Sequence, residues 1–139
     1  MFNVKNLVIL VVVLVGIQFI PYGKDHTNPP AKAIAWDSPR TQELFNKSCA
    51  DCHSNNTKWR WYTSIAPMSW LAYYDVKDGR KHFNVSENVS AKKLHEAVEE
   101  LEANEMPVLQ YTLIHPDAKL SKQERDELIR GLRNTFSKN

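Results

Sequence analysis

The sequence contains very little cysteine, and this scarcity excludes several classes of protein. Its 139 residues include two cysteines, Cys49 and Cys52, which stand three positions apart. A disulfide between them would close only a very short loop, so a small secreted fold held by several disulfides is excluded. No cysteine lies near the N-terminus, which argues against a lipid-modified N-terminus.

A large excess of charge of one sign is also missing. The chain has 18 lysines and arginines against 16 aspartates and glutamates, so its net charge is +2. A nucleic-acid-binding domain is dominated by basic residues, and this composition therefore excludes that class. The charge is unevenly distributed, however. Residues 40–81 carry seven basic and four acidic groups, whereas residues 91–105 carry two lysines and five glutamates.

Long apolar runs are absent except at the N-terminus, where residues 7–20 read LVILVVVLVGIQFI. Lys5 precedes this run and Tyr22 follows it, a pattern typical of an exported chain. No A-x-A cleavage pattern follows, so residues 1–22 are predicted to form an uncleaved, single-pass transmembrane anchor. A cleaved signal peptide and a buried helix are the alternatives. With an anchor or a signal, the rest of the chain lies outside the cytoplasm, on the outer side of the inner membrane.

Internal repeats and alternating strand patterns are missing from the remainder. Residues 23–37 are rich in proline and polar residues and are predicted to be a linker. Residues 38–137 then form one domain, in which Ser38 before Pro39 predicts a helix that runs to about Cys49. A second helix is expected to start at Pro67 and to end near Gly79.

Two further helices are predicted by their caps and by their apolar spacing. Ser90 opens one, in which apolar residues recur at helical spacing: Leu94, Ala97, Val98 and Leu101. Ser121 with Glu124 forms a capping box before the other, and its apolar face consists of Leu128, Ile129, Leu132 and Phe136. The fold class is therefore all-α.

The two cysteines belong to the motif Cys49-Ala-Asp-Cys52-His53. Cys-x-x-Cys-His is the attachment signature of c-type haem, in which both thiols bind the haem covalently and the histidine coordinates the iron. A structural zinc site needs four ligands and usually a second cysteine pair, and a thioredoxin-like dithiol needs a preceding strand. Neither feature is found. One covalently bound haem c is therefore the expected cofactor.

A sixth iron ligand should come from a methionine or a histidine. Met106 is the leading candidate because it lies just past a predicted helix and Pro107 keeps its backbone extended. Its alternative role is that of a gap-filling core side chain. His115, before Pro116, is the other candidate, and ligation by two histidines would lower the reduction potential. Core packing better explains Met68, and a helix surface better explains His95.

Aromatic residues are concentrated in one short span, residues 59–74. Trp59, Trp61 and Trp70 have the bulk to form the wall of a porphyrin pocket, although a hydrophobic core explains at least some of them. Lys58 and Arg60 alternate with the tryptophans, so they are expected to face water or the haem propionates.

The runs CADCHSNNTKWRWYTSIAPMSWLAYYDVKDGRKHFNVSE and EMPVLQYTLIHPDAKLS resemble the haem-binding domain family of bacterial single-haem proteins. The resemblance covers about residues 36–135. Family members typically have Trp-Pro-Trp and Met-Pro-Pro, where this chain has Arg60 and Val108. The resemblance implies haem attachment at Cys49, Cys52 and His53, with Met106 as distal ligand and Tyr111 beside the cofactor.

The segment after Met106 is also similar to the C-terminal third of class I cytochromes c, which implies a cytochrome c-like helical fold. In that class a proline soon after the attachment motif supplies a carbonyl to the ligating histidine. The resemblance therefore implies that the Ala66-Pro67 region accepts a hydrogen bond from His53.

These observations predict a membrane-anchored, extracytoplasmic cytochrome c that carries one electron between redox protein partners, such as those of a respiratory membrane complex. On this hypothesis the chain is not an enzyme. The alternatives are a haem enzyme or gas sensor with an open distal iron site, and a haem-bearing accessory subunit of a membrane complex. The uneven charge is by default a solvated surface, and otherwise it steers a redox partner.

Overall fold

The structure, a computed structural model, describes residues 3–137. Within that range the chain forms helices and short 3-10 turns and no strand, which confirms the predicted all-α class. The α-helices are α1 (Val4–Gly16), α2 (Pro39–Ser48), α3 (Ala50–His53), α4 (Met68–His82), α5 (Ala91–Glu102), α6 (Leu109–Ile114) and α7 (Lys122–Phe136). The 3-10 turns are η1 (Ile17–Phe19), η2 (Trp61–Ser64) and η3 (Pro116–Ala118).

The N-terminal apolar segment is helical, but its helix is short. α1 has 13 residues, about 20 Å at 1.5 Å per residue, whereas the hydrocarbon core of a bilayer is about 30 Å thick. No helix among residues 3–137 is both long and apolar enough to cross a membrane. The structure therefore does not support the transmembrane helix predicted over residues 1–22, of which Met1 and Phe2 lie outside the described residues.

The predicted helix starts are confirmed by their caps. Ser38 accepts a hydrogen bond from the Thr41 amide, and Ser90 caps α5 in the same way. Ser121 and Glu124 form the reciprocal capping box at the start of α7. The predicted end of α4 near Gly79 is wrong, because this helix continues to His82.

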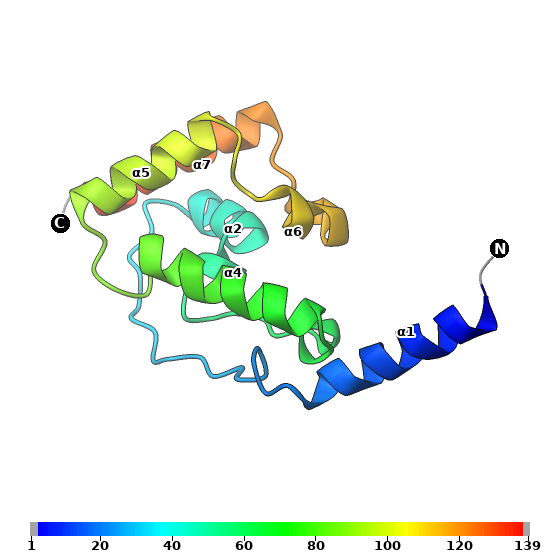
Figure 1. Cartoon of the computed structure of the whole chain (residues 1–139). Coiled ribbons are helices and arrows are strands. Elements are labelled where there is room, and N and C mark those ends of the chain that lie inside the picture. Colours follow the sequence, from blue (N-terminus) through cyan, green and yellow to red (C-terminus); the bar gives the residue numbers. More distant parts are fainter. Residues whose placement is uncertain (1–2, 138–139) are drawn as a thin grey trace.

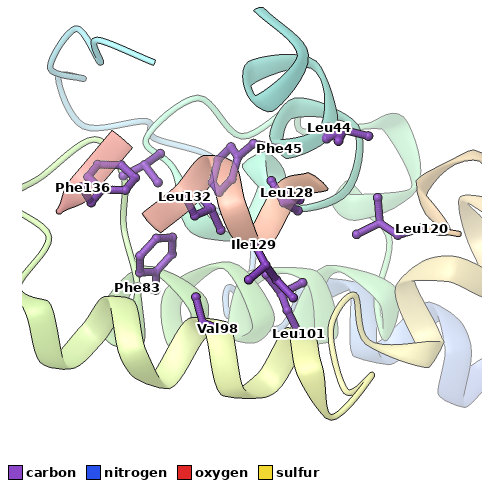
Figure 2. Packing of buried hydrophobic residues seen from close by; sticks show 11 residues of the cluster. Leu44, Phe45, Phe83, Val98, Leu101, Leu120, Leu128, Ile129, Leu132 and Phe136 are labelled. Atoms are coloured by element: carbon purple, nitrogen blue, oxygen red, sulfur yellow. The ribbon is translucent and has the colours of Figure 1, made fainter. Parts of the chain in front are cut away.

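The hydrophobic core lies between α2, α5 and α7. Figure 2 shows Leu44 and Phe45 of α2 against Leu128 and Leu132 of α7. Val98 and Leu101 of α5 and Phe83, which follows α4, close the core from below in that view. α5 and α7 run side by side in Figure 1.

Residues 23–37 contain no helix but lie along the surface of the domain. The Asn28 side chain donates to the Thr57 carbonyl at 2.9 Å, and the Asn55 side chain donates to the Pro30 carbonyl at 2.9 Å. The His26 ring stacks on Trp59 with 4.4 Å between ring centroids. Figure 1 shows this segment running beneath α4 from α1 to α2. The predicted linker is thus attached to the domain along much of its length.

Candidate functional site

A cavity of about 490 Å³ opens between the helices that carry the cysteine motif and α5. This volume is within the range of small-molecule and cofactor sites. One wall comes from α3, α4 and Phe83, and the opposite side from α5 and the segment after it. The lining includes Phe45, Cys49, Asp51, Cys52, His53, Asp75, Asp78, Gly79, His82, Phe83, Lys93, Glu96, Ala97, Glu100, Leu101, Met106, Pro107, Val108, Tyr111 and Leu132.

Both cysteines line this cavity as free, half-buried thiols. Cys49 ends α2, where its amide donates to the Phe45 carbonyl at 2.8 Å, and Cys52 lies on α3. Burial raises the pKa of Cys49 to about 12. Burial, followed by the charges of Asp75 and Asp51, raises the pKa of Cys52 to about 12. Both side chains are therefore neutral thiols at physiological pH.

His53 presents one ring nitrogen to backbone carbonyls. Its Nδ1 lies 2.9 Å from the Phe83 carbonyl oxygen and 3.1 Å from that of Gly79. Carbonyl oxygens only accept, so Nδ1 carries the proton and Nε2 keeps its lone pair. Burial lowers the pKa of His53, which also favours the neutral ring. A neutral imidazole with Nδ1 held in this way has the form of a metal-ligating histidine.

The prediction that the Ala66-Pro67 region accepts a hydrogen bond from His53 is wrong. The carbonyls that accept from His53 belong to the last turn of α4 and to the residue after it. Pro67 is exposed and does not line the large cavity. His53 is held by the end of α4 instead of its beginning, because α3 meets α4 at the C-terminal half of α4.

Gly79 is a residue beside the cysteine motif whose role in the fold the sequence reasoning misassigned. A Cβ atom at this position would lie 2.7 Å from the backbone oxygen of Cys52 and 3.0 Å from its Cβ. α4 can therefore approach the cysteine motif this closely only where it has no side chain. The helix continues through Gly79, so no local signal distinguished this glycine from a helix end.

Met106 lines the large cavity from the segment between α5 and α6 and packs against the edge of the core. It lies on a different wall from His53. His115 does not line this cavity. Its Nε2 is 2.6 Å from the Tyr62 hydroxyl, and the ring lies beside a small second hollow.

Three other methionine and histidine side chains are placed less favourably. Met68 lines only the small hollow. His95 is 71% exposed beside Glu99. His82 does reach the rim of the large cavity, but its side chain is 63% exposed and pairs with Asp78.

Asp51, between the two cysteines, joins the motif to α6. The Tyr111 hydroxyl donates to its Oδ2 at 2.8 Å, and Arg60 Nη2 is 3.7 Å from the same oxygen. Tyr111 lines the cavity, as expected, and its ring packs on that of His115, with 4.5 Å between the ring centroids. Burial and the Asp51 charge raise the pKa of Tyr111, so its hydroxyl stays protonated and donates. Sequence reasoning missed Asp51 because the contact spans 60 residues.

The three tryptophans do not form the wall of this cavity within the described chain. Trp59 stacks on His26 and borders the small hollow, Trp61 is 78% exposed, and Trp70 is half-buried away from both spaces. The aromatic span packs instead around η2 and the first half of α4, so the expectation that these tryptophans form the wall of a porphyrin pocket is not met. Lys58 and Arg60 do not line the cavity, but both are exposed, as expected of residues that face water.

Among residues 3–137, no three His, Cys, Asp or Glu side chains come together in a cluster that would hold a metal ion. The zinc alternative finds no support in that part of the chain.

The chain was then compared with known proteins. A family model described as a haem-binding domain matches residues 12–134. The chain belongs to the haem-binding domain family. It is also 28% identical over 108 residues to the cytochrome c peroxidase Ccp of Escherichia coli (strain K12). That alignment covers 71% of the chain and 23% of the peroxidase, so the chain spans about a quarter of the length of this relative. No solved structure matches the chain.

The residues present fit a haem of this family. Leu101 and Leu132 give the cavity an apolar interior, while Cys49 and Cys52 place two neutral thiols on its wall. A neutral imidazole and a thioether, the two iron ligands that cytochromes c use, also line it. The acidic groups at the rim, among them Glu96 and Glu100, outnumber the basic ones.

Proposed function

We propose that this protein is a one-electron carrier with a single haem c, bound covalently through Cys49 and Cys52. His53 is the proximal iron ligand and Met106 the distal one. The observation that carries the proposal is the His53 ring, which lines the same cavity as Met106 and whose Nδ1 is tied to two carbonyls, so that Nε2 keeps its lone pair. Bound haem supplies one-electron redox chemistry at its iron.

Each group of residues then has a separate role. The carbonyls of Gly79 and Phe83 orient the imidazole and raise its basicity as an iron ligand. Leu101, Leu132 and Phe45 exclude water from the inner end of the cavity. The thioether of Met106 fills the distal position, so a small molecule has no open site. Electron transfer without a substrate is the function that such a closed site supports.

We also propose that the apolar N-terminal segment attaches the protein to the inner membrane, with the haem domain outside the cytoplasm. All large apolar side chains from Val4 to Val15 in α1 are exposed, and Lys5 lies at its start. The partners are then redox proteins at the same membrane, such as a respiratory complex. Separation of membrane and soluble fractions from cells that express the full chain checks this location.

A peroxide-reducing haem domain is the second candidate, favoured by the relative that is named a cytochrome c peroxidase. That activity needs an open distal position or one from which Met106 departs. It makes the opposite prediction about binding of small ligands at the iron.

The test is the optical spectrum of the haem-loaded full chain, oxidised, reduced and exposed to carbon monoxide. We expect a low-spin spectrum, no carbon monoxide binding, and haem that resists acidic acetone extraction. Met106→Ala should open the iron to carbon monoxide, whereas Met68→Ala, a methionine outside the large cavity, should not. A parent protein that binds carbon monoxide readily and turns over peroxide would favour the second candidate.

A further inference from the structure

Large exposed apolar side chains of the folded domain gather on one face. η2 and the residue after it contribute Trp61 and Ile65, α4 contributes Leu71 and Tyr74, and α6 contributes Leu109, Leu113 and Ile114. Trp61, Leu109 and Leu113 are each more than 65% exposed. Contiguous exposed apolar surface of this kind marks an interaction site.

The exposed apolar side chains of these three elements, with Ile65, are here called the apolar face. The elements meet around a hollow of about 60 Å³, which is lined by Tyr62 of η2, Leu71 of α4 and Ile114 of α6. The hollow is too small for an organic ligand. The face around it is therefore suited to a broad surface and not to a small molecule.

The apolar face is continuous with the N-terminal helix. The Gln18 side chain accepts from the Ala66 amide and donates to the Ala66 carbonyl, both at 2.9 Å. The Tyr22 ring meets Tyr73 edge-on, with 5.3 Å between centroids. These contacts fix the end of α1 next to Ile65, and Figure 1 shows α1 leaving the domain where α4 begins.

Charges of both signs lie near this junction. Lys24 Nζ donates to the Gln18 carbonyl, Arg60 immediately precedes Trp61, and Lys77 lies 5.8 Å from the centroid of the Tyr73 ring. The carboxylates here are Asp25 and Asp78, which follow Lys24 and Lys77, Asp51, which faces Arg60, and Asp75, which lines the hollow. Most glutamates of the domain's acidic region lie instead on α5, which contributes nothing to the apolar face.

We propose that the apolar face lies on the surface of a lipid bilayer, the same membrane to which α1 attaches. Exposed Trp and Tyr side chains such as Trp61 and Tyr74 favour the boundary between headgroups and acyl chains. Trp61, Leu109 and Leu113 enter that boundary, while α5 with its glutamates points toward the aqueous phase. The inference rests on the proposed membrane attachment and is independent of the electron-carrier role.

Hydroxyl-radical footprinting of the haem-loaded full chain in nanodiscs tests this orientation. The discs hold one chain each and contain phosphatidylcholine with phosphatidylglycerol. Side-chain modification is normalised to the exposed fraction and to intrinsic reactivity, and His95, which is 71% exposed on α5, is the internal reference. We expect Trp61, Leu109 and Leu113 to be modified at least threefold less than this reference.

A matched pair of variants sharpens the result. Leu113→Glu places a charge on the exposed part of the apolar face, and Ala91→Glu places one on an exposed position at the start of α5. Leu113→Glu should increase the modification of Trp61 at least twofold, and Ala91→Glu should leave it unchanged. Neither side chain is buried, so both variants should fold.

Three outcomes would overturn the proposal. If the apolar face is modified as much as His95, it is exposed to water and free to bind a redox protein instead of lipid. Protection that appears only with two chains per disc would assign it to a second copy of the chain. Failure of the chain to co-elute with the discs would overturn the membrane attachment as well. The haem spectrum of the same sample reports on the electron-carrier role separately.

Discussion

Asp51 ties the attachment motif to the segment that carries Met106. Tyr111 is five residues beyond Met106, and its hydroxyl donates to Asp51 at 2.8 Å. The two ends of this hydrogen bond lie on the cysteine side and on the methionine side of the cavity. The bond therefore limits how far α6 and the preceding loop can move from the motif.

Tyr111→Phe should loosen this connection. We expect the free energy of unfolding to fall by about 1 kcal/mol, the net contribution of one hydrogen bond. Carbon monoxide should also bind to part of the haem-loaded population, because Met106 is held less firmly. Urea unfolding and a carbon monoxide titration measure the two effects. Tyr74→Phe is the control, since its ring is 57% exposed; equal effects from both variants would refute the role of Tyr111.

Gly79 gives a second prediction at this scale. Gly79→Ala should gain about 0.5–1 kcal/mol of helix propensity, but its Cβ would meet the Cys52 backbone oxygen at 2.7 Å. Relief of that overlap requires α4 to move, at about 1–3 kcal/mol. We therefore expect net destabilisation and reduced haem incorporation, measured by denaturant unfolding and by haem content per chain. Gly16→Ala, where nothing lies within 4 Å, should keep the gain in helix propensity and be neutral to slightly stabilising.

At the residue scale the sequence was informative where the chemistry is local. The cysteine motif and the Met106 loop were recognisable because each is complete within a few neighbouring residues. The carbonyls bound by His53 and the Asp51 contact could not be predicted, because they depend on where α4 and α6 return to the motif. The prediction for the tryptophans was wrong for the same reason. Their bulk suits a porphyrin pocket, but the fold places them around η2 and the first half of α4.

Among the elements, α2, α5 and α7 followed directly from their serine caps and apolar spacing. The extent of α4 did not, because a glycine ends a helix or allows close packing according to its tertiary neighbours. α1 was expected to be longer, since hydropathy shows where a segment is apolar but does not fix where its helix ends.

The start of α7 should make stability depend on pH. A hydrogen bond from Lys47, and further ones from Ser121, lower the pKa of Glu124 from 4.5 to about 2. A carboxyl whose pKa is depressed on folding stabilises the protein above its unfolded pKa and loses that contribution as pH falls toward the folded value. We expect part of the acid destabilisation between about pH 5 and pH 2 to disappear in Glu124→Gln, as measured by unfolding at fixed temperature. Glu99→Gln, which changes an exposed side chain of α5, should retain the full acid destabilisation.

For the molecule as a whole, the core and the haem cavity share side chains. Phe45, Phe83, Leu101 and Leu132 belong to both. These residues line a cavity of about 490 Å³, and a haem held there would bury apolar surface that protein side chains do not cover. Folding and haem binding are therefore linked.

This linkage predicts a large difference between the two forms. Haem loading should raise the free energy of unfolding by several kcal/mol, which corresponds to a rise in Tm of at least about 10 °C for a domain of this size. Calorimetry of the full chain, with and without haem, measures it. A Tm that does not change would mean that the cavity is already supported by the protein alone.

For the proposed membrane-attached electron carrier, the path of residues 23–37 limits how far the haem domain can move. The bonds of Asn28 and Asn55 and the stacking of His26 on Trp59 hold this segment against the domain, so it provides no slack. A tethered carrier with a loose linker can travel between a donor and an acceptor that are both fixed in place. This domain has no such reach. On the proposed carrier role, its donor and acceptor must therefore come to it in turn, and we expect them to inhibit each other competitively at one exposed surface.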